Sequence, residues 1–501
     1  MIIDSILASG LWAVAFGVLI WTLYTAGKAY VDPLRDVDGP FVARFTGLWH
    51  LKKIFDGKFE LVNIALHKKY GTVVRIAPNV YSIDDPDCAK VLYGHGSKFV
   101  KASWYSAWMP PDPNKASLFG DIDPHHHALQ RRKFASSYSM TSLVGYESFV
   151  NNCTKLFADK LSDIAKRNEK IDLAHWFQCY AFDVIGEITF GHRFGFLEDS
   201  TRTDVFDAID TRNHYSTFVG LFPSWLHRML FPLLPTTGGH GYVGKYTMDE
   251  IASRERLLKS PDVKERDGKP DFVSRFFQIR QEDPNKMTKM DIFTMCQSNI
   301  GAGSDTTAIS LSATVYNLLK HPETYKRLKE EIDEAAAWGK ISDPISFKEA
   351  QELPFLQAVI KEALRLHSAT GLPLARVVPE GGAMLAGKHF PAGATVGINS
   401  WVAHRNPNVF GPDADIWRPE RWLNKDDTTI AEMDRYFLAF GLGSRTCLGK
   451  NLSMLEMSKL IPQLLRTFDF VLGEQLQYQD WDTKSRWFVK PLNFYVNVVR
   501  R

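Results

Sequence analysis

Apolar residues recur at every third or fourth position along much of the chain between about residues 145 and 370. Clear examples are VGYESFVNNCTKLFADKLSDIAKR, residues 144–167, and PETYKRLKEEIDEA, residues 322–335. This spacing places the apolar side chains on one face of an α-helix. The pattern therefore predicts a predominantly helical region in the middle of the chain.

Strand-like segments are short and lie outside this region. They are rich in β-branched and aromatic residues, which favour strands. The segments are TVVRIAPNVYSI (72–83), RVVPEG (376–381), ATVGIN (394–399) and RWFVKPLNFYVNVV (486–499). Many helices with a few scattered strands predict a mainly α fold with a small β-sheet region.

The amino-terminal 28 residues carry a different pattern. Residues 6–26, ILASGLWAVAFGVLIWTLYTA, contain no charge, and as a helix they would reach about 31 Å, enough for a hydrocarbon core of about 30 Å. Lys28 and Arg35 follow this segment, whereas only Asp4 precedes it, and this bias favours a cytosolic body. The pattern predicts a membrane anchor at residues 1–28. A cleaved signal peptide is the alternative, but its apolar region is normally shorter.

The segment after the predicted anchor reads as a hinge. Residues 29–45 contain DPLRDVDGP, in which two prolines and a glycine favour a stiff connection. Residues 46–501 are long enough for one large domain or two ordinary ones, and no internal repeat or low-complexity tract divides them. We therefore expect a single large domain behind the hinge.

Composition narrows the class of protein. Hydrophobic residues make up 45% and charged residues 23% of the chain, as in an ordinary globular protein. The net charge of +3 gives no reason to expect nucleic-acid binding. The five cysteines are odd in number, far apart and without a CxxC pair, so a disulfide framework or a zinc finger is not expected. This usage suits a reducing compartment.

One cysteine, Cys447, lies in FGLGSRTCLGKNLSMLEM, residues 440–457, directly before a run with helical periodicity. Its sulfur would lie at a helix amino terminus, where free N–H groups lower the pKa of a thiol. Gly443 and Gly449 let the backbone turn tightly and approach something flat. Such a loop could supply a thiolate nucleophile or a thiolate metal ligand. A nucleophile needs a histidine base, and only the distant His404 stays open for that role.

The spacing Phe440-x-x-Gly443-x-Arg445-x-Cys447-x-Gly449 resembles the heme-binding signature of the cytochromes P-450, the heme-thiolate monooxygenases. Five fixed positions within ten residues make this a specific signal. The resemblance implies a cytochrome P-450 fold with heme b, whose iron takes Cys447 as its axial thiolate ligand. It also implies that Arg445 pairs with a heme propionate and that Phe440 packs beside the ligand.

A second motif concerns the support of that pocket. Glu362 and Arg365 lie three positions apart in FLQAVIKEALRLH, and alone such a pair is usually a surface ion pair of little energetic weight. The later segment FGPDADIWRPERW resembles the family's proline–glutamate–arginine segment. The resemblance implies that Glu362, Arg365 and Arg421 form a buried charge network that supports the fold and the heme pocket.

A third motif is IGAGSDTTAISLSATVYNLL, residues 300–319. Its glycines and threonines are poor helix formers, yet the flanks predict a long apolar helix. A helix packed closely through its glycines is one interpretation. The other is that Ala302 to Thr307 resembles the family's oxygen-activation segment. The resemblance implies that Thr306 holds the bound oxygen and its protons, with Asp305 helping to deliver them; a threonine hydroxyl can also bond back along its helix.

The segment DIDPHHHALQRRKF, residues 121–134, contains three consecutive histidines, which point in different directions in any regular structure. A zinc site is therefore not expected. His127 and Arg131 lie four positions apart and resemble the family's propionate clamp, with histidine in place of the usual tryptophan. Arg376, in LPLARVVPE, occupies the position of a third propionate partner in the same resemblance.

All motifs occur in family order, and the resemblance spans about residues 30–500. The longer sequence segments around these motifs are similar to those of fungal microsomal members of the pisatin demethylase-like type. The resemblance implies a single-pass protein of the endoplasmic reticulum membrane, with residues 46–501 as a cytosolic monooxygenase domain. It also implies O₂ as co-substrate and electrons from NADPH through a separate NADPH–cytochrome reductase, with cytochrome b5 open as a second donor.

The substrate would be a lipophilic small molecule. A fungal secondary metabolite (a terpenoid, polyketide or phenolic) is the first expectation, and a detoxifying hydroxylase or demethylase of a plant or xenobiotic aromatic compound is the alternative. Three rival functions stay open: an oxygen-independent heme-thiolate isomerase or dehydratase, a non-catalytic heme binder, and a Cys447 thiol hydrolase without heme.

Two further expectations concern the substrate region. The predicted pocket lining is aromatic and aliphatic with few charges; it comprises Trp104 to Phe119, Met295 to Ala302, Ser368 to Leu374 and Trp487 to Phe488. The apolar stretch from Tyr215 to Tyr242, broken by prolines and glycines, is either a buried helix with a loop or an apolar surface that dips into the membrane near a substrate entrance.

Overall fold

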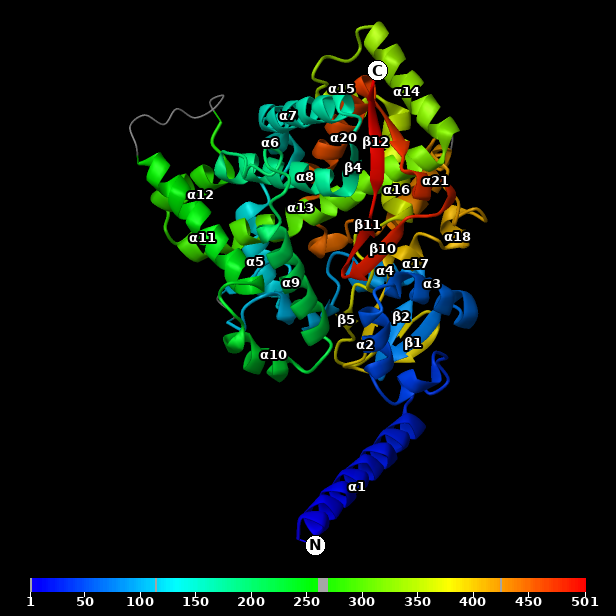
Figure 1. Cartoon of the computed structure of the whole chain (residues 1–501). Coiled ribbons are helices and arrows are strands. Elements are labelled where there is room, and N and C mark those ends of the chain that lie inside the picture. Colours follow the sequence, from blue (N-terminus) through cyan, green and yellow to red (C-terminus); the bar gives the residue numbers. More distant parts are fainter. Residues whose placement is uncertain (1, 113–114, 260–268, 424–425) are drawn as a thin grey trace.

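The structure is a computed structural model that describes residues 2–112, 115–259, 269–423 and 426–501. Helix α1 (Ile2–Val31) projects away from the body at one end of the molecule (Figure 1). The side chains of residues 2–11, 13–15 and 18 lie outside the description, and with them much of the predicted membrane span. Among the helices as described, none is both long and apolar enough to cross a membrane.

The body is mainly helical, as the periodicity predicts. Its helices are α2 (Leu48–Phe55), α3 (Phe59–Tyr70), α4 (Pro86–Tyr93), α5 (Pro124–Phe134), α6 (Met140–Val144), α7 (Glu147–Lys166), α8 (Leu173–Phe190), α9 (Asp204–Val219), α10 (Ser224–Leu230), α11 (Gly239–Leu258), α12 (Phe272–Glu282), α13 (Lys289–Lys320), α14 (Pro322–Ala337), α15 (Phe347–Gln351), α16 (Pro354–Leu366), α17 (Ser400–Ala403), α18 (Pro407–Phe410), α19 (Asp427–Arg435), α20 (Lys450–Thr467) and α21 (Glu474–Tyr478). The two helical examples of the sequence correspond to α7 and α14.

The strands are short and fall in four small sheets of the described chain. They are β1 (Val73–Ala77), β2 (Val80–Ile83), β3 (Val100–Lys101), β4 (Lys170–Asp172), β5 (Arg376–Val377), β6 (Ala383–Leu385), β7 (Lys388–Phe390), β8 (Thr395–Gly397), β9 (Phe468–Leu472), β10 (Asp482–Arg486), β11 (Phe488–Leu492) and β12 (Tyr495–Arg500). The largest sheet has the order β1-β2-β8-β5-β3, and the others are β4-β12-β9, β10-β11 and β6-β7. Each strand-like segment of the sequence forms at least one of these strands.

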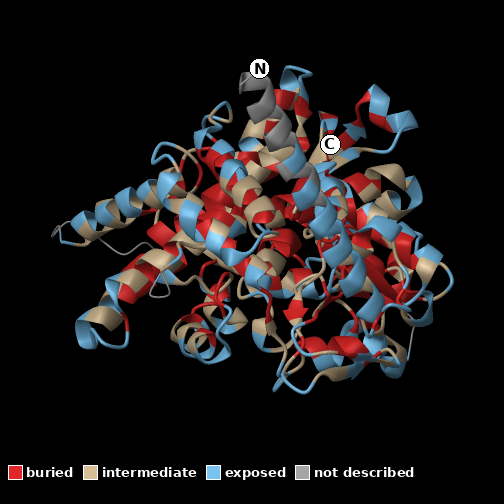
Figure 2. Cartoon of the chain, turned by 90° about the horizontal axis from the view of Figure 1, so that it is seen from below, coloured by how far each residue is buried: buried red, intermediate tan, exposed pale blue. Residues whose placement is uncertain are grey.

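Helix α13 runs through the centre of the helical region, where Figure 2 shows the buried residues concentrated. A capping box starts it: the Thr288 hydroxyl accepts the Asp291 N–H at 3.0 Å, and the Asp291 carboxylate accepts the Thr288 N–H at 2.8 Å. Its main partner is α8, whose residues from Cys179 to Phe190 are all buried. Because α13 is packed on several sides, side chains on its remaining face have fixed positions.

Candidate functional site

A cavity of about 330 Å³ lies between α13, α5, strands β3 and β5, and the loop that carries Cys447. All four predicted lining segments contribute to it. From the segments before and within α13 come Tyr105, Trp108, Met109, Phe119, Met295, Asn299, Gly301 and Ala302; from the later ones come Ala369, Thr370, Leu374, Trp487 and Phe488. The lining is more charged than the sequence indicates, because Lys101 and Arg212 also reach the cavity.

Cys447 lies on the wall of this cavity with its side chain exposed. The Cys447 N–H donates to the Phe440 carbonyl at 2.8 Å, which closes the loop just before α20 begins at Lys450. The Cys447 side chain is open to the cavity but surrounded by protein, and this desolvation raises the pKa of the thiol, while the N–H groups of Gly449 and Lys450 oppose that rise. The predicted position at a helix amino terminus is confirmed. The other cysteines of the described chain are buried.

The loop depends on glycine at one position. Gly443 has a φ of +61°, and a Cβ on it would lie 2.0 Å from the Tyr93 carbonyl oxygen. Any other residue would therefore both strain the backbone and collide with α4. Gly449 is the N-cap of α20 and has an ordinary φ of −81°. Gly449 therefore affects the Cys447 thiol through its backbone N–H, and not through a backbone conformation that only glycine can adopt.

Three arginines predicted from separate motifs, Arg131, Arg376 and Arg445, converge on this cavity. Within the described chain none of them forms an ion pair. Arg445 donates to the Asp121 carbonyl at 2.9 Å, and Arg376 donates to the Ala375 carbonyl at 3.0 Å. Burial lowers the pKa of Arg131 and brings that of Arg445 to about 10. These guanidinium groups are therefore partly shielded from water, yet no carboxylate of the described chain pairs with them.

A fourth cation, Lys101, makes the imbalance larger. Strands β3 and β5 pair so that Lys101 lies directly opposite Arg376, an arrangement that is unfavourable for like charges. Burial lowers the pKa of Lys101 well below its ordinary value, and the charges of Arg445 and Arg376 add to that effect. In the sequence, Lys101 is a single lysine within FVKASW, and nothing in that segment predicts that it lies in the cavity wall. The side of the cavity that is lined by Lys101 and the three arginines therefore carries no compensating anion among the described residues.

His127 adds a neutral donor to the same side. It is buried on α5, one turn before Arg131, and both line the cavity, as the motif predicts. Burial and the neighbouring Arg445 lower the pKa of His127 to about 3, so the ring is neutral at physiological pH. The other two histidines of the triplet diverge: His125 is exposed, and His126 contacts the Asp121 carboxylate at 2.8 Å.

A flat cofactor with two carboxylates and a metal that accepts a thiolate fits this wall of the cavity. Three arginines without ion partners match two propionates, the neutral His127 can donate a further hydrogen bond, and the Cys447 sulfur is accessible from the same space. Heme b combines these features. The donor set of the structure is thus chemically suited to heme.

Thr306 lies on the face of α13 that lines the cavity. Its hydroxyl donates to the Ala302 carbonyl at 2.9 Å, which confirms the predicted bond back along the helix. Thr307 turns toward α20, where its hydroxyl lies 3.2 Å from that of Ser453. The interpretation of a helix packed through its glycines is confirmed, because Gly303 packs against Ile185 of α8. Thr306 faces the open space, and its part in oxygen activation stays a prediction.

Asp305 is buried behind Thr306 and does not line the cavity. Its carboxylate accepts from Gln178 at 2.6 Å and lies 3.0 Å from the Lys490 ammonium. Burial raises the pKa of Asp305, and the charge of Lys490 opposes that rise. Lys490 also pairs with Asp210, which is about half exposed, so a row of titratable groups leads from the surface to Asp305, the residue before Thr306. Sequence reasoning missed Lys490 because β11 lies far from α13 in the chain.

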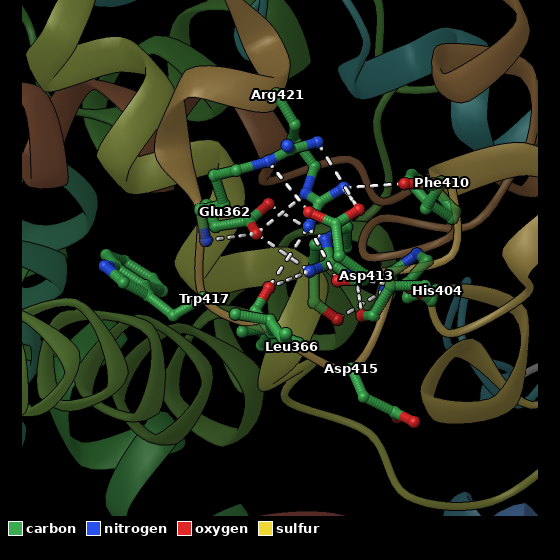
Figure 3. A network of polar contacts seen from close by, with 12 residues as sticks. Glu362, Leu366, His404, Phe410, Asp413, Asp415, Trp417 and Arg421 are labelled. Carbon is green, nitrogen blue, oxygen red and sulfur yellow. Dashed lines mark hydrogen bonds and ion pairs between the residues drawn. The ribbon is translucent and has the colours of Figure 1, made fainter.

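The predicted charge network is fully buried (Figure 3). Arg365 donates to both oxygens of Glu362 at 2.8 Å, and Arg421 donates to one of them at 2.9 Å. The Trp422 indole N–H supplies a further bond at 2.9 Å. Every oxygen of this buried carboxylate therefore has a partner, which is the condition under which such a network is stable.

His404 connects this network to the cysteine loop. One ring nitrogen lies 2.9 Å from the Arg365 carbonyl, and the other accepts the Leu438 N–H at 2.7 Å. Burial lowers the pKa of His404 to about 3, which keeps the ring neutral and able to accept. Both nitrogens are engaged and His404 does not line the cavity, so the structure gives no support to His404 as a base for the Cys447 thiol.

The sequence comparisons agree with the site. The cytochrome P450 family model matches residues 39–498. The chain belongs to the cytochrome P450 family. The P450 is 38% identical over 484 residues to a pisatin demethylase of Fusarium vanettenii, with 94% of this chain and 91% of that protein covered.

Two further fungal relatives are P450 monooxygenases. The cytochrome P450 monooxygenase cicH of Emericella nidulans is 37% identical over 93% of this chain and 94% of its own length. The cytochrome P450 monooxygenase gsfF of Penicillium aethiopicum is 34% identical over 99% of each chain. Membership of the family implies that this P450 is an oxidoreductase with a heme bound through a cysteine thiolate, that it uses O₂, and that a redox partner supplies electrons.

Proposed function

We propose that this chain is a heme-thiolate monooxygenase in which Cys447 would supply the thiolate that holds the heme, and that it inserts one O₂-derived oxygen atom into a lipophilic small molecule. The observation that carries the proposal is the cavity itself. The accessible Cys447 sulfur, three arginines without ion partners and the Thr306 hydroxyl all face the same space. When bound there, the heme supplies the activation of O₂.

The residues around the heme position have distinct roles in this proposal. Arg131, Arg376 and Arg445 neutralise the propionates, and His127 donates a hydrogen bond to one of them. Phe440 packs beside the sulfur, while the N–H groups that follow Cys447 favour its thiolate form. Glu362, Arg365 and Arg421 are not among the residues that line the cavity, and they hold the scaffold.

Thr306 is the proton-holding group next to the reaction space. Because its O–H hydrogen is donated to the Ala302 carbonyl, its oxygen lone pairs can accept a hydrogen bond from a proton-bearing group and hold that group in place. Asp305 lies behind it, and Lys490 and Asp210 extend the row of titratable groups to the surface. Delivery by a positioned group is commonly worth about 10²–10⁴-fold in rate.

Electrons come from NADPH through a separate NADPH–cytochrome reductase, with cytochrome b5 as a second possible donor. The reductase docks on the side of the cysteine loop. Lys450 is exposed there, with its ammonium 5.7 Å from the centre of the Phe440 ring. Arg445 is turned into the cavity, so Lys450 rather than Arg445 is available to a partner on this side.

The protein is anchored in the endoplasmic reticulum membrane by residues 1–28, with the heme domain in the cytosol. Two features support this. The described apolar side chains of α1, including Trp12, Phe16 and Leu23, are exposed. Helix α10 and the turn after it expose Trp225 and Leu233 at the same end of the molecule as α1 (Figure 1).

The physiological role is the synthesis of a fungal secondary metabolite. The named relatives support oxidation of small molecules but not one substrate. The similarity to pisatin demethylases keeps open a second role, the hydroxylation or demethylation of a plant or xenobiotic aromatic compound.

The first test is the ferrous–carbon monoxide spectrum of Cys447→Ser. We expect the substitution to abolish the red-shifted band that a thiolate ligand produces, because a serine hydroxyl does not replace the thiolate. Cys88→Ser, which changes a buried cysteine outside the cavity, is the matched control and should keep the band. A Cys447→Ser protein that keeps the band would show that the ligand lies elsewhere.

Turnover separates the remaining rivals. Microsomes that contain the protein and a reductase should convert substrate with stoichiometric use of NADPH and O₂. Product without NADPH or O₂ would indicate an isomerase or dehydratase, and a heme protein without turnover of any candidate metabolite would indicate a ligand carrier.

A further inference from the structure

Arg212 is a cation in the cavity that the proposed function does not use. It lies on α9, and its guanidinium rests against Gly301 of α13, where a Cβ would come within 2.4 Å of one of its nitrogens. Its Nε is buried without a partner, and within the described chain its side chain forms no hydrogen bond or ion pair. The glycine at position 301 is what leaves room for this placement.

Arg212 is half-buried: its Nε is enclosed, and the residue lines the cavity. Partial burial lowers the pKa of Arg212 to about 10, which still leaves the guanidinium charged at neutral pH. An enclosed donor without a partner is unfavourable. The position of Arg212 on the cavity wall therefore points to an anionic partner that enters the cavity.

The neighbouring groups of the protein do not satisfy it. Asp305 attracts Arg212 electrostatically but forms no ion pair with it, since its carboxylate already contacts Gln178 and Lys490. His240 is held neutral, because burial and the charge of Arg212 lower its pKa well below the ordinary value. Neither group supplies the missing anion.

Arg212 is also separate from the arginines assigned to the propionates. Those residues come from α5, β5 and the cysteine loop, whereas Arg212 comes from α9 and contacts the α13 backbone. Gly301 precedes Thr306 by five residues, which corresponds to about 7.5 Å along the helix axis. An anion bound at Arg212 would therefore lie some distance from the position where oxygen is activated.

We propose that Arg212 binds a carboxylate of the substrate, so that the enzyme acts on lipophilic organic acids. The inference rests on the proposed function and specifies its substrate class. The rest of that substrate lies against Ile185, Met295 and Phe488, which are apolar and line the same cavity. Carboxylate binding positions the molecule, and the apolar contacts supply most of the buried area.

The arrangement also predicts where the molecule is oxidised. The carbon that receives oxygen should lie at least about 7.5 Å from the acid group, the axial distance from Gly301 to Thr306. Short acids such as benzoate would be held too far from the reaction space. Acids with a fused ring or a longer chain would reach it.

The test uses the heme-loaded enzyme and direct binding by equilibrium dialysis. The probes are aryl and alkyl carboxylates of graded length, among them a methoxynaphthoate, each paired with its neutral methyl ester. We expect the wild-type protein to prefer the longer acids over their esters. Arg212→Gln should weaken acid binding by about 10- to 100-fold, the usual range for a lost charge-assisted hydrogen bond, and leave the esters within about threefold.

Three variants complete the design. Arg212→Lys should restore part of the acid preference, because it keeps the charge. Gly301→Ala should weaken acids selectively, because the new methyl group displaces the guanidinium without removing it. Arg228→Gln removes the same charge from an exposed position of α10 and should change nothing.

The outcomes distinguish this inference from the proposed function. A wild-type protein that binds no acid better than its ester, or an Arg212→Gln protein that loses acids and esters equally, overturns the carboxylate site. Heme binding, the thiolate-type carbon monoxide band and NADPH-dependent O₂ consumption would then still stand. Retention of that band in Cys447→Ser would overturn only the heme ligand and leave the Arg212 measurements unaffected, since they need no turnover.

Discussion

At the residue scale, Thr306 is the side chain whose position has the most direct chemical consequence. It faces the cavity, whereas the adjacent Asp305 is buried against Gln178 of α8, and Thr307 reaches the cavity wall but contacts the Ser453 hydroxyl of α20. A helix turns by about 100° per residue, so neighbours in sequence have separate functions here. The hydroxyl can serve the reaction while the carboxylate behind it is kept out of contact with substrate.

Thr306→Ala should uncouple NADPH use from product formation. The substitution removes the cavity-facing hydroxyl that holds a proton, and it leaves the propionate cations and the Cys447 loop unchanged. NADPH would still be consumed, but more of it would end as hydrogen peroxide, with product per NADPH falling about 10-fold or more. The measurement is product, NADPH and peroxide in the same reaction.

Thr314→Ala is the control for that measurement. Thr314 lies on the same helix and makes the same bond back along it, to the Ser310 carbonyl at 2.8 Å, but does not line the cavity. Its ratio of product to NADPH should match the wild type. A Thr306→Ala protein with an unchanged ratio would remove Thr306 from proton delivery.

At the scale of elements, the charge network joins α16 to the segments that precede the cysteine loop. Glu362 and Arg365 lie on α16, Arg421 lies in the 3-10 turn Pro419–Trp422, and His404 follows α17. The neutral His404 ring then accepts the Leu438 N–H at the start of the loop. The network thereby fixes the position of the loop relative to the helices that enclose the cavity.

His404→Gln should therefore change how stability depends on pH. The pKa of His404 is about 3 in the folded protein and about 6.5 when unfolded, so its contribution is complete above about pH 6.5 and is lost as pH falls toward 3. Between about pH 7.5 and 5 the wild type loses about 2 kcal/mol through this residue, since the unfolded chain takes up a proton that the folded one excludes. The variant has no histidine at position 404, so its stability does not change with pH through this residue.

The observable is the difference in the free energy of unfolding between variant and wild type, from urea titrations at both pH values. His404→Gln should be less stable than the wild type at about pH 7.5, and that deficit should shrink by about 2 kcal/mol at pH 5. His389→Gln, which changes an exposed histidine of β7, should show no such trend. A constant deficit would mean that His404 is not the neutral acceptor.

Local motifs were readable from the sequence because each is confined to one turn or loop. The cysteine loop, the α13 motif and the Glu362–Arg365 pair each place their residues by helix geometry or a tight turn alone. Lys101, Lys490 and Arg212 were missed for the opposite reason. Their roles arise from the register of short strands and from the packing of α9 on α13, which hydrophobic periodicity does not encode. The charged lining of the cavity was therefore underestimated.

At the scale of the whole molecule, a group of exposed apolar side chains lies at the end from which α1 projects. Trp225, Met229 and Leu233, on α10 and in the turn after it, are each more than half exposed. Helix α10 and α1 lie at the same end of the molecule in Figure 1, whereas α14 lies at the other. The stretch from Tyr215 to Tyr242 thus contains an exposed apolar surface as well as the buried His227.

Deletion of residues 1–28 should leave a protein that binds membranes more weakly but still measurably. Serine at positions 225, 229 and 233 should then weaken binding of the truncated protein to phospholipid vesicles by at least 10-fold, because each buried apolar side chain contributes about 1.5–3 kcal/mol when fully transferred. Trp338→Ser, which removes an equally exposed tryptophan after α14, should have no effect. The assay is vesicle sedimentation in high salt, which screens charge attraction. If the triple variant binds as well as its truncated parent, the α10 surface does not contact the membrane, and residues 1–28 would be the anchor without help from the body.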